Sequence, residues 1–180
     1  MELIPSYISN TAPSGEKIFF DLASKDKALD KWTLFWDTRI DVHESKKDGQ
    51  CDFIFLGPPG LFFIEVKGGD FYESKNGLHR WGWLNAKTPL NEKNESPLAQ
   101  AQGNMYSVMK YLKGKIGNKI NFRDILFVYG AAHPEANLTG LKGDLEYDPS
   151  QVFHKNNESV SHYIKNLESH FKNNKYKRDN

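Results

Sequence analysis

The chain has 180 residues, of which 38% are hydrophobic and 26% are charged, a composition typical of a globular domain and not of a disordered or collagen-like chain. Its single cysteine, Cys51, excludes a disulfide framework and a cysteine-rich zinc site, and no apolar run approaches the ~20 residues of a membrane-spanning helix. With 24 basic and 23 acidic residues, the net charge of +1 does not by itself indicate a nucleic-acid binder. We therefore expect a cytoplasmic protein with one domain over residues 1–172 and a disordered tail or linker over residues 173–180.

Hydrophobic periodicity and turn residues predict alternating helices and strands along the chain. In chain order we expect a helix over residues 14–30, strands over 32–40, 52–56 and 61–67, a hairpin over 71–83, a helix over 97–112, strands over 125–131 and 151–153, and a helix over 160–171. Residues 43–50 and 86–96 are polar and are expected to form loops, as is His133, which precedes a proline. This order favours an α/β (or α+β) fold, with one mixed sheet between helices.

The predicted strand over residues 61–67 ends in two charged side chains, Glu65 and Lys67, after a run of apolar residues. Side chains alternate along a strand, so these two share one face of the sheet while Val66 points to the other. Burying a carboxylate and an ammonium is costly unless the groups are paired or bind something. The end of this strand is therefore a candidate functional site.

A third charged residue joins the pair through the preceding hairpin. If the turn centres on Pro58 and Pro59, Asp52 lies directly opposite Glu65, with their Cβ atoms about 4.5–5.5 Å apart. Two carboxylates this close favour a divalent cation between them, and oxygen ligands favour Mg²⁺ or Mn²⁺. A metal at this position could activate a water and polarise a phosphoryl oxygen, and Lys67 beside it could offset the charge that develops, so the arrangement favours phosphodiester hydrolysis.

An alternative reading needs no catalysis. Glu65 and Lys67 can form a same-face ion pair at a strand end, with Asp52 capping the polar loop. A register slip of one residue would also separate Asp52 from Glu65.

The order of these motifs resembles the nuclease-related domain (NERD) family of the PD-(D/E)XK nuclease superfamily. The segments that carry the resemblance are Gly15-Glu16 opening the first helix, Cys51-Asp52, Glu65-Val66-Lys67, Ser96-Pro97 with Gln100, and the tryptophan-containing hairpin at residues 77–83. The resemblance implies a restriction-endonuclease-like core: a helix, three antiparallel strands, a helix and a strand, with an added hairpin and a C-terminal helix.

The resemblance also implies divalent-metal-dependent cleavage of nucleic acid, DNA rather than RNA, that leaves a 5′-phosphate and a 3′-hydroxyl. Asp52, Glu65 and Glu16 would ligate Mg²⁺ or Mn²⁺, Lys67 would position the attacking water, and Gln100 would complete the site. Domains of this family are often joined to helicases, so a helicase or another motor domain is an expected partner.

Several of these residues have competing explanations. Glu16 in the first turn of a helix gains about 0.3–1 kcal/mol from the helix dipole without any catalytic role. Gln102 competes with Gln100, because the helical wheel places Gln102 closer to the apolar face, whereas the spacing from Pro97 favours Gln100. Trp81 and Trp83 could stack on bases or simply cover the sheet.

Two other functions remain open. The same fold could bind nucleic acid or a partner protein without cutting. A metal-independent hydrolase could instead use Glu16 and Glu65 as acid and base, and it would remain active in EDTA.

Overall fold

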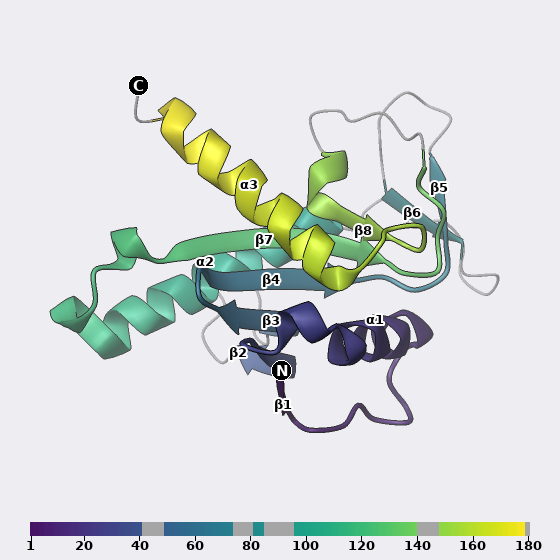
Figure 1. Cartoon of the computed structure of the whole chain (residues 1–180), viewed down its shortest axis with the longest axis horizontal. Coiled ribbons are helices and arrows are strands. Elements are labelled where there is room, and N and C mark those ends of the chain that lie inside the picture. Colours follow the sequence, from purple (N-terminus) through teal and green to yellow (C-terminus); the bar gives the residue numbers. More distant parts are fainter. Residues whose placement is uncertain (41–48, 74–80, 85–95, 140–147, 179–180) are drawn as a thin grey trace.

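The computed structural model of the chain describes residues 1–40, 49–73, 81–84, 96–139 and 148–178. A mixed sheet of six strands forms its centre, in the order β1-β2-β3-β4-β7-β8, and β5 and β6 form a separate two-stranded sheet (Figure 1). The strands are β1 (Glu2–Ile4), β2 (Thr33–Ile40), β3 (Gly49–Gly57), β4 (Gly60–Val66), β5 (Asp70–Glu73), β6 (Trp81–Leu84), β7 (Leu126–His133) and β8 (Val152–His154). Strands β2, β3 and β4 are antiparallel, whereas β7 runs parallel to β4. The predicted α/β mixed sheet is confirmed, and it is consistent with a restriction-endonuclease-like core.

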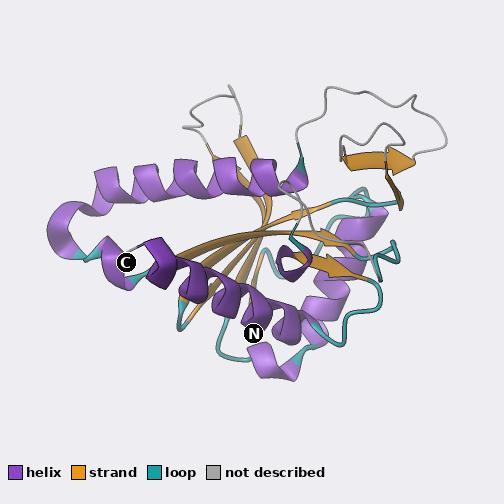
Figure 2. Cartoon of the chain, turned by 90° about the horizontal axis from the view of Figure 1, so that it is seen from above, coloured by secondary structure: helices purple, strands orange, loops and turns teal. Residues whose placement is uncertain are grey.

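Three helices cover the two faces of the sheet. They are α1 (Ser14–Lys25), α2 (Pro97–Ile116) and α3 (Val160–Arg178), and the 3₁₀ turns are η1 (Lys27–Leu29), η2 (Gly117–Lys119), η3 (Phe122–Asp124) and η4 (Pro149–Gln151). Figure 2 shows α2 on one side of the sheet and α1 and α3 on the other. None of the helices in the described ranges has the length and apolarity needed to cross a membrane.

Aromatic packing holds α1 against the sheet. The fully buried ring of Phe19 meets the rings of Phe53, Phe55 and Phe153 edge to face, with centroids 5.3–6.1 Å apart. On the other face Ile54 and Phe63 pack with Met105 of α2. Because side chains alternate along β3 and β4, each strand contributes to both cores, which explains why these strands read as continuous apolar runs.

The helix boundaries differ from the predicted ones. α1 ends at Lys25 and not near residue 30, because the Asp26 carboxylate accepts hydrogen bonds from the backbone N–H groups of Ala28 in η1 and Ser161 in α3. α2 continues past residue 112 until Gly117, whose φ of 59° no longer fits a helix. α3 continues to Arg178, beyond the predicted end of the helix at residue 171, and the division of the chain into a domain over 1–172 and a tail over 173–180 stays a prediction.

Other sequence-based expectations have mixed outcomes. His133 is the last residue of β7 and fully buried, not a loop residue, and β1 was not predicted. The strands of the predicted hairpin over residues 71–83 pair antiparallel. Its turn, the side chains of Trp81 and Trp83, and nearly all of the loops expected over 43–50 and 86–96 lie outside the described residues.

The N-terminus of α1 meets the end of β4 through two glycines. A Cβ atom on the buried Gly15 would lie 2.9 Å from the Cα of Gly68, closer than real Cβ contacts allow. The backbone of Gly68 cannot move aside as a flexible side chain can. Glycine at position 15 therefore lets Glu16, the next residue, approach the strand that carries Glu65 and Lys67.

We expect Gly15→Ala to lower the free energy of unfolding by about 1–3 kcal/mol, because the added methyl group overpacks this contact. Gly114→Ala is the matched control, since a Cβ there meets nothing within 4 Å. In the helix interior it should raise stability by about 0.5–1 kcal/mol. Urea denaturation measures both changes. Equal effects of the two substitutions would show that the Gly15–Gly68 approach is not tight.

Candidate active site

The hairpin of β3 and β4 has the register that the sequence predicts. Pairs run from Gly57 opposite Gly60 to Phe53 opposite Ile64, which brings Asp52 to the position facing Glu65. At this position a side-chain hydrogen bond joins the two strands: Asp52 Oδ2 accepts a hydrogen bond of 2.8 Å from the backbone N–H of Val66. The Asp52 carboxylate is therefore fixed beside the end of β4.

Glu65, Lys67 and Gln100 form a connected set at this end of the sheet. Glu65 is only 6% exposed, and its Oε1 lies 2.5 Å from Lys67 Nζ. Lys67 Nζ also donates a hydrogen bond of 2.9 Å to Gln100 Oε1, in the first turn of α2. Val66 points into the opposite core, as alternation predicts.

The two candidate glutamines have different partners. Gln100 reaches Lys67, whereas Gln102 donates a hydrogen bond of 3.0 Å to the hydroxyl of Tyr129 on β7. Gln102 thus faces the sheet, as the helical wheel indicates. Gln100 contacts the charged set because it lies in the first turn of α2, beside the end of β4.

Glu16 approaches the site from the opposite face, through α1. Its Oε2 accepts a hydrogen bond of 3.0 Å from Trp36 Nε1 on β2. Burial raises the pKa of Glu16, the bond from Trp36 opposes this change, and the negative charges of Asp37 and Glu65 add to it. Glu16 therefore lies within electrostatic reach of Glu65. Trp36 was not predicted as a partner, since nothing in sequence spacing links it to Glu16.

A backbone irregularity in β2 adds another acid to this neighbourhood. Asp37 has a φ of 53°, in the left-handed region that non-glycine residues seldom adopt. The pairing of β2 with β3 is interrupted here, between Trp36–Phe53 and Thr38–Cys51, so Asp37 takes the position facing Asp52. The Asp37 carboxylate accepts a hydrogen bond from Gln50. Such local strain is common at functional sites.

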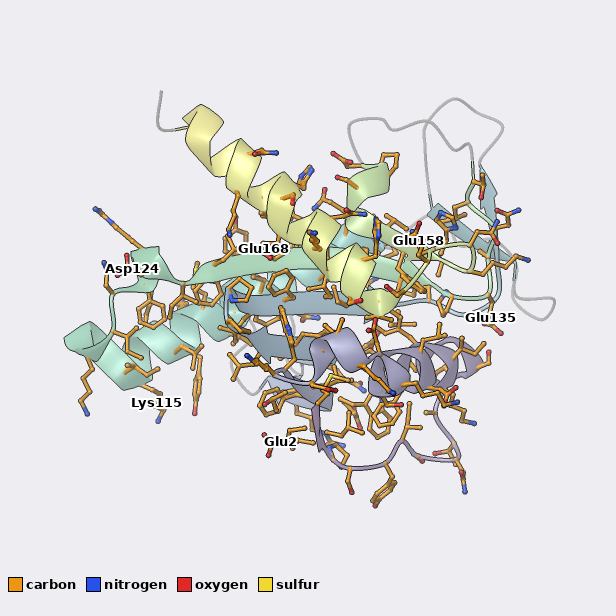
Figure 3. The ribbon with its side chains drawn as sticks, in the orientation of Figure 1. Glu2, Lys115, Asp124, Glu135, Glu158 and Glu168 are labelled. Carbon is orange, nitrogen blue, oxygen red and sulfur yellow. The ribbon has the colours of Figure 1, made fainter. Side chains whose placement is uncertain are left out.

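Glu135, just after β7, connects the segments that carry the site. Its Oε2 accepts hydrogen bonds from the backbone N–H of Gly69 at 2.7 Å and from Ser14 Oγ at 3.1 Å. It thereby joins the loop after Lys67 to the start of α1, and Figure 3 shows it near the strand ends. Glu135 was not predicted as a site residue, although parallel pairing of β4 with β7 would have indicated that the ends of these strands are adjacent.

The electrostatics of the site centre on Asp52. Burial and the neighbouring charge of Glu65 raise the pKa of Asp52 to about 8, although the Val66 N–H and Lys67 favour its charged form. The negative charge of Glu65 thus favours the protonated form of Asp52. A cation between them would remove the repulsion that holds the proton.

The donor atoms suit a hard divalent ion that keeps part of its water shell. Within the described ranges, no three His, Cys, Asp or Glu side chains are gathered so as to hold a metal ion by themselves. Mg²⁺ is commonly bound by one or two carboxylates, with waters and substrate phosphate oxygens completing its coordination. Asp52 and Glu65 supply those two carboxylates, so the residues fit the metal that the resemblance implies.

Comparison with known protein families shows which family the chain belongs to. The family model described as the nuclease-related domain matches residues 13–129. The chain belongs to the nuclease-related domain family. Neither the curated proteins nor the solved structures gave a match. The matched segment of this nuclease-related domain includes Glu16, Asp52, Glu65, Lys67 and Gln100.

We expect the free energy of unfolding of the metal-free domain to fall as the pH rises from about 5 to 8. In that range the raised pKa of Asp52 keeps a proton on the folded protein that the unfolded chain has released, and the slope is at most about 1.4 kcal/mol per pH unit. Asp52→Asn should flatten this dependence, because an amide keeps the bond to Val66 without a charge. Urea titrations at pH 5.5, 7 and 8.5 measure it, and parallel curves for both proteins would contradict it.

Proposed function

We propose that this nuclease-related domain is a Mg²⁺- or Mn²⁺-dependent nuclease that hydrolyses phosphodiester bonds of DNA. One observation carries the proposal: Lys67 Nζ contacts both Glu65 at the end of β4 and Gln100 on α2, and Asp52 accepts a hydrogen bond from Val66, the residue between Glu65 and Lys67. Two neighbouring carboxylates with a lysine close by are an arrangement that suits metal-assisted hydrolysis. Family membership independently supports an action on nucleic acid.

The residues would divide the work as follows. Asp52 and Glu65 would hold the ion, with Glu16 contributing from α1. When bound, such an ion supplies Lewis-acid activation of water and of the scissile phosphate. Lys67 would orient the attacking water through its ammonium and offset the negative charge that grows on the phosphate. Gln100, by accepting a hydrogen bond from Lys67 Nζ, would fix the direction of that ammonium.

A non-catalytic binding module is the second candidate, and the 2.5 Å contact between Glu65 and Lys67 is the observation that favours it. An ion pair this close gives the buried Glu65 carboxylate and the partly exposed Lys67 ammonium a partner without any metal or substrate. The two functions differ in what they require of Asp52. A binding module needs no charge there, whereas a metal site does. In either case the family resemblance supports a role beside a helicase or another motor domain.

The decisive experiment is cleavage of labelled single- and double-stranded DNA with Mn²⁺ or Mg²⁺. We expect cutting by the wild-type protein, none in EDTA, and a loss of about 10²-fold or more in kcat for Lys67→Ala. Lys31→Ala, an exposed lysine at the end of η1, is the control and should cut normally. Cutting in EDTA would support the metal-independent hydrolase, and no cutting at all would favour the binding module.

The choice between the two glutamines is tested with the same assay. Gln100→Ala should lower kcat by about tenfold or more, because Lys67 loses the acceptor that orients it. Gln102→Ala removes only the bond to Tyr129 and should leave kcat close to that of the wild type. The reverse order of effects would show that Gln102 serves the site.

A further inference from the structure

The second half of α2 and the segment that follows it are strongly basic. Residues 97–123 contain five basic side chains and no Asp or Glu. All five are exposed, and we call them the α2 basic surface: Lys110, Lys113, Lys115, Lys119 and Arg123. The first acid after them is Asp124, which accepts a hydrogen bond from Asn121. A net charge of +1 for the whole chain conceals this concentration.

Exposed tyrosines lie among these lysines. Tyr106 is 46% exposed and Tyr111 is 47% exposed. Tyr106, Lys110 and Lys113 recur at spacings of four and three, which places them on one face of the helix. Tyr111 and Lys115 form a second such pair, in which Lys115 Nζ lies 5.6 Å from the ring centroid. Each tyrosine therefore lies beside a lysine, and both side chains are exposed to solvent.

The helix dipole does not account for the whole surface. Lys113 and Lys115 in the last turn gain from the negative C-terminal end of α2. Lys119 and Arg123 lie beyond the helix, where that gain is absent. In α1 and α3 ion pairs join a lysine to an acid four residues earlier, Asp21–Lys25 and Glu168–Lys172. The sequence of α2 contains no Asp or Glu, so the helix has no pair of this kind within itself and its side chains carry positive charge only.

The surface lies away from the candidate active site but along the same helix. Gln100 and Lys113 are 13 residues apart on α2, roughly 20 Å at 1.5 Å per residue. Figure 3 shows Lys115 at the end of the molecule opposite Glu135, which lies near the site. Duplex DNA carries one charge per about 1.7 Å of axis, which is two charges and about 3.4 Å per base pair. A distance of roughly 20 Å therefore corresponds to roughly six base pairs.

We propose that the α2 basic surface binds the phosphate backbone of duplex DNA, about six base pairs from the bond that the active site cuts. The inference rests on the proposed action on DNA and adds the surface that holds the substrate. Lysines contact phosphates as point charges, and tyrosine hydroxyls also donate to phosphates. Duplex DNA is favoured over a single strand, because its higher charge density releases more counterions per lysine.

The test is fluorescence anisotropy with a 30-base-pair DNA duplex, in EDTA, at KCl concentrations from 50 to 200 mM. The variant K113Q/K115Q/K119Q removes three charges from the surface. The control K25Q/K27Q/K31Q removes three exposed lysines at the end of α1, in η1 and just after η1, on the other face of the sheet. The variant K113R/K115R/K119R keeps the charges and should bind like the wild type.

We expect the slope of log Kd against log salt to fall by about 2–3 for the surface variant, and affinity at 0.1 M KCl to weaken by about tenfold to a few hundredfold. The control should keep the wild-type slope. Equal losses of affinity in the surface variant and the control would show that only net charge matters, and this result would overturn the proposal. Failure of the wild-type protein to bind the duplex would also overturn it. Tighter binding of a single strand or of duplex RNA would overturn the assignment to duplex DNA.

Cleavage assays with Mn²⁺ on the same preparations separate this inference from the proposed nuclease activity. Cutting by the wild type with unchanged salt slopes would reject the surface and leave the nuclease. A slope that falls in a protein that cuts no DNA would support the surface while the nuclease proposal fails.

Discussion

The burial of Glu65 at the end of β4 is the constraint on which the rest of the site depends. A carboxylate that is 6% exposed cannot remain charged without a partner, and Lys67, just after the end of β4, supplies one. Lys67 Nζ in turn donates a hydrogen bond to Gln100, which connects α2 to the end of the strand. Asp52 lies beside Glu65, and its own burial together with the negative charge of Glu65 raises the pKa of Asp52 to about 8. The position of Glu65 thus contributes to the protonation of Asp52.

The central hairpin could be predicted from the sequence because its register is set locally. Pro58 and Pro59 fix the turn, and every pair from Gly57–Gly60 to Phe53–Ile64 follows from it. Alternation then fixes which face Glu65 and Lys67 share. These steps use neighbours in the chain, where geometry has few alternatives, and they suffice to bring Asp52 to Glu65.

The remaining contacts depend on elements distant in the sequence, and for that reason the sequence does not predict them. The hydrogen bond from Trp36 to Glu16 depends on where α1 lies along β2. The left-handed backbone of Asp37 was not predicted, because aspartate adopts this region more often than most residues but still only occasionally. The end of α1 at Lys25 depends on Asp26 reaching Ser161 of α3, which no local pattern records. Helical periodicity also ranked Gln102 above Gln100, because a wheel shows the face of a side chain but not its height along the sheet.

The net charge of the chain is also a poor guide to what it binds, because it does not show where in the fold the charged side chains lie. Asp37, Asp52 and Glu65 occupy neighbouring strands at one end of the sheet, and Glu16 adds a fourth acid from α1. Such an end repels a phosphate backbone until a cation neutralises it, so acids that would serve hydrolysis would also oppose DNA binding. A protein that acts on DNA can compensate with positive charge placed where it does not pair with those acids. Lys113 and Lys115 of α2 meet that requirement, because they lie roughly 20 Å along the helix from Gln100, beyond about two Debye lengths at physiological salt. At that separation the solvent screens the attraction between the two charged regions. The acids can then bind a cation and the lysines a polyanion without cancelling each other.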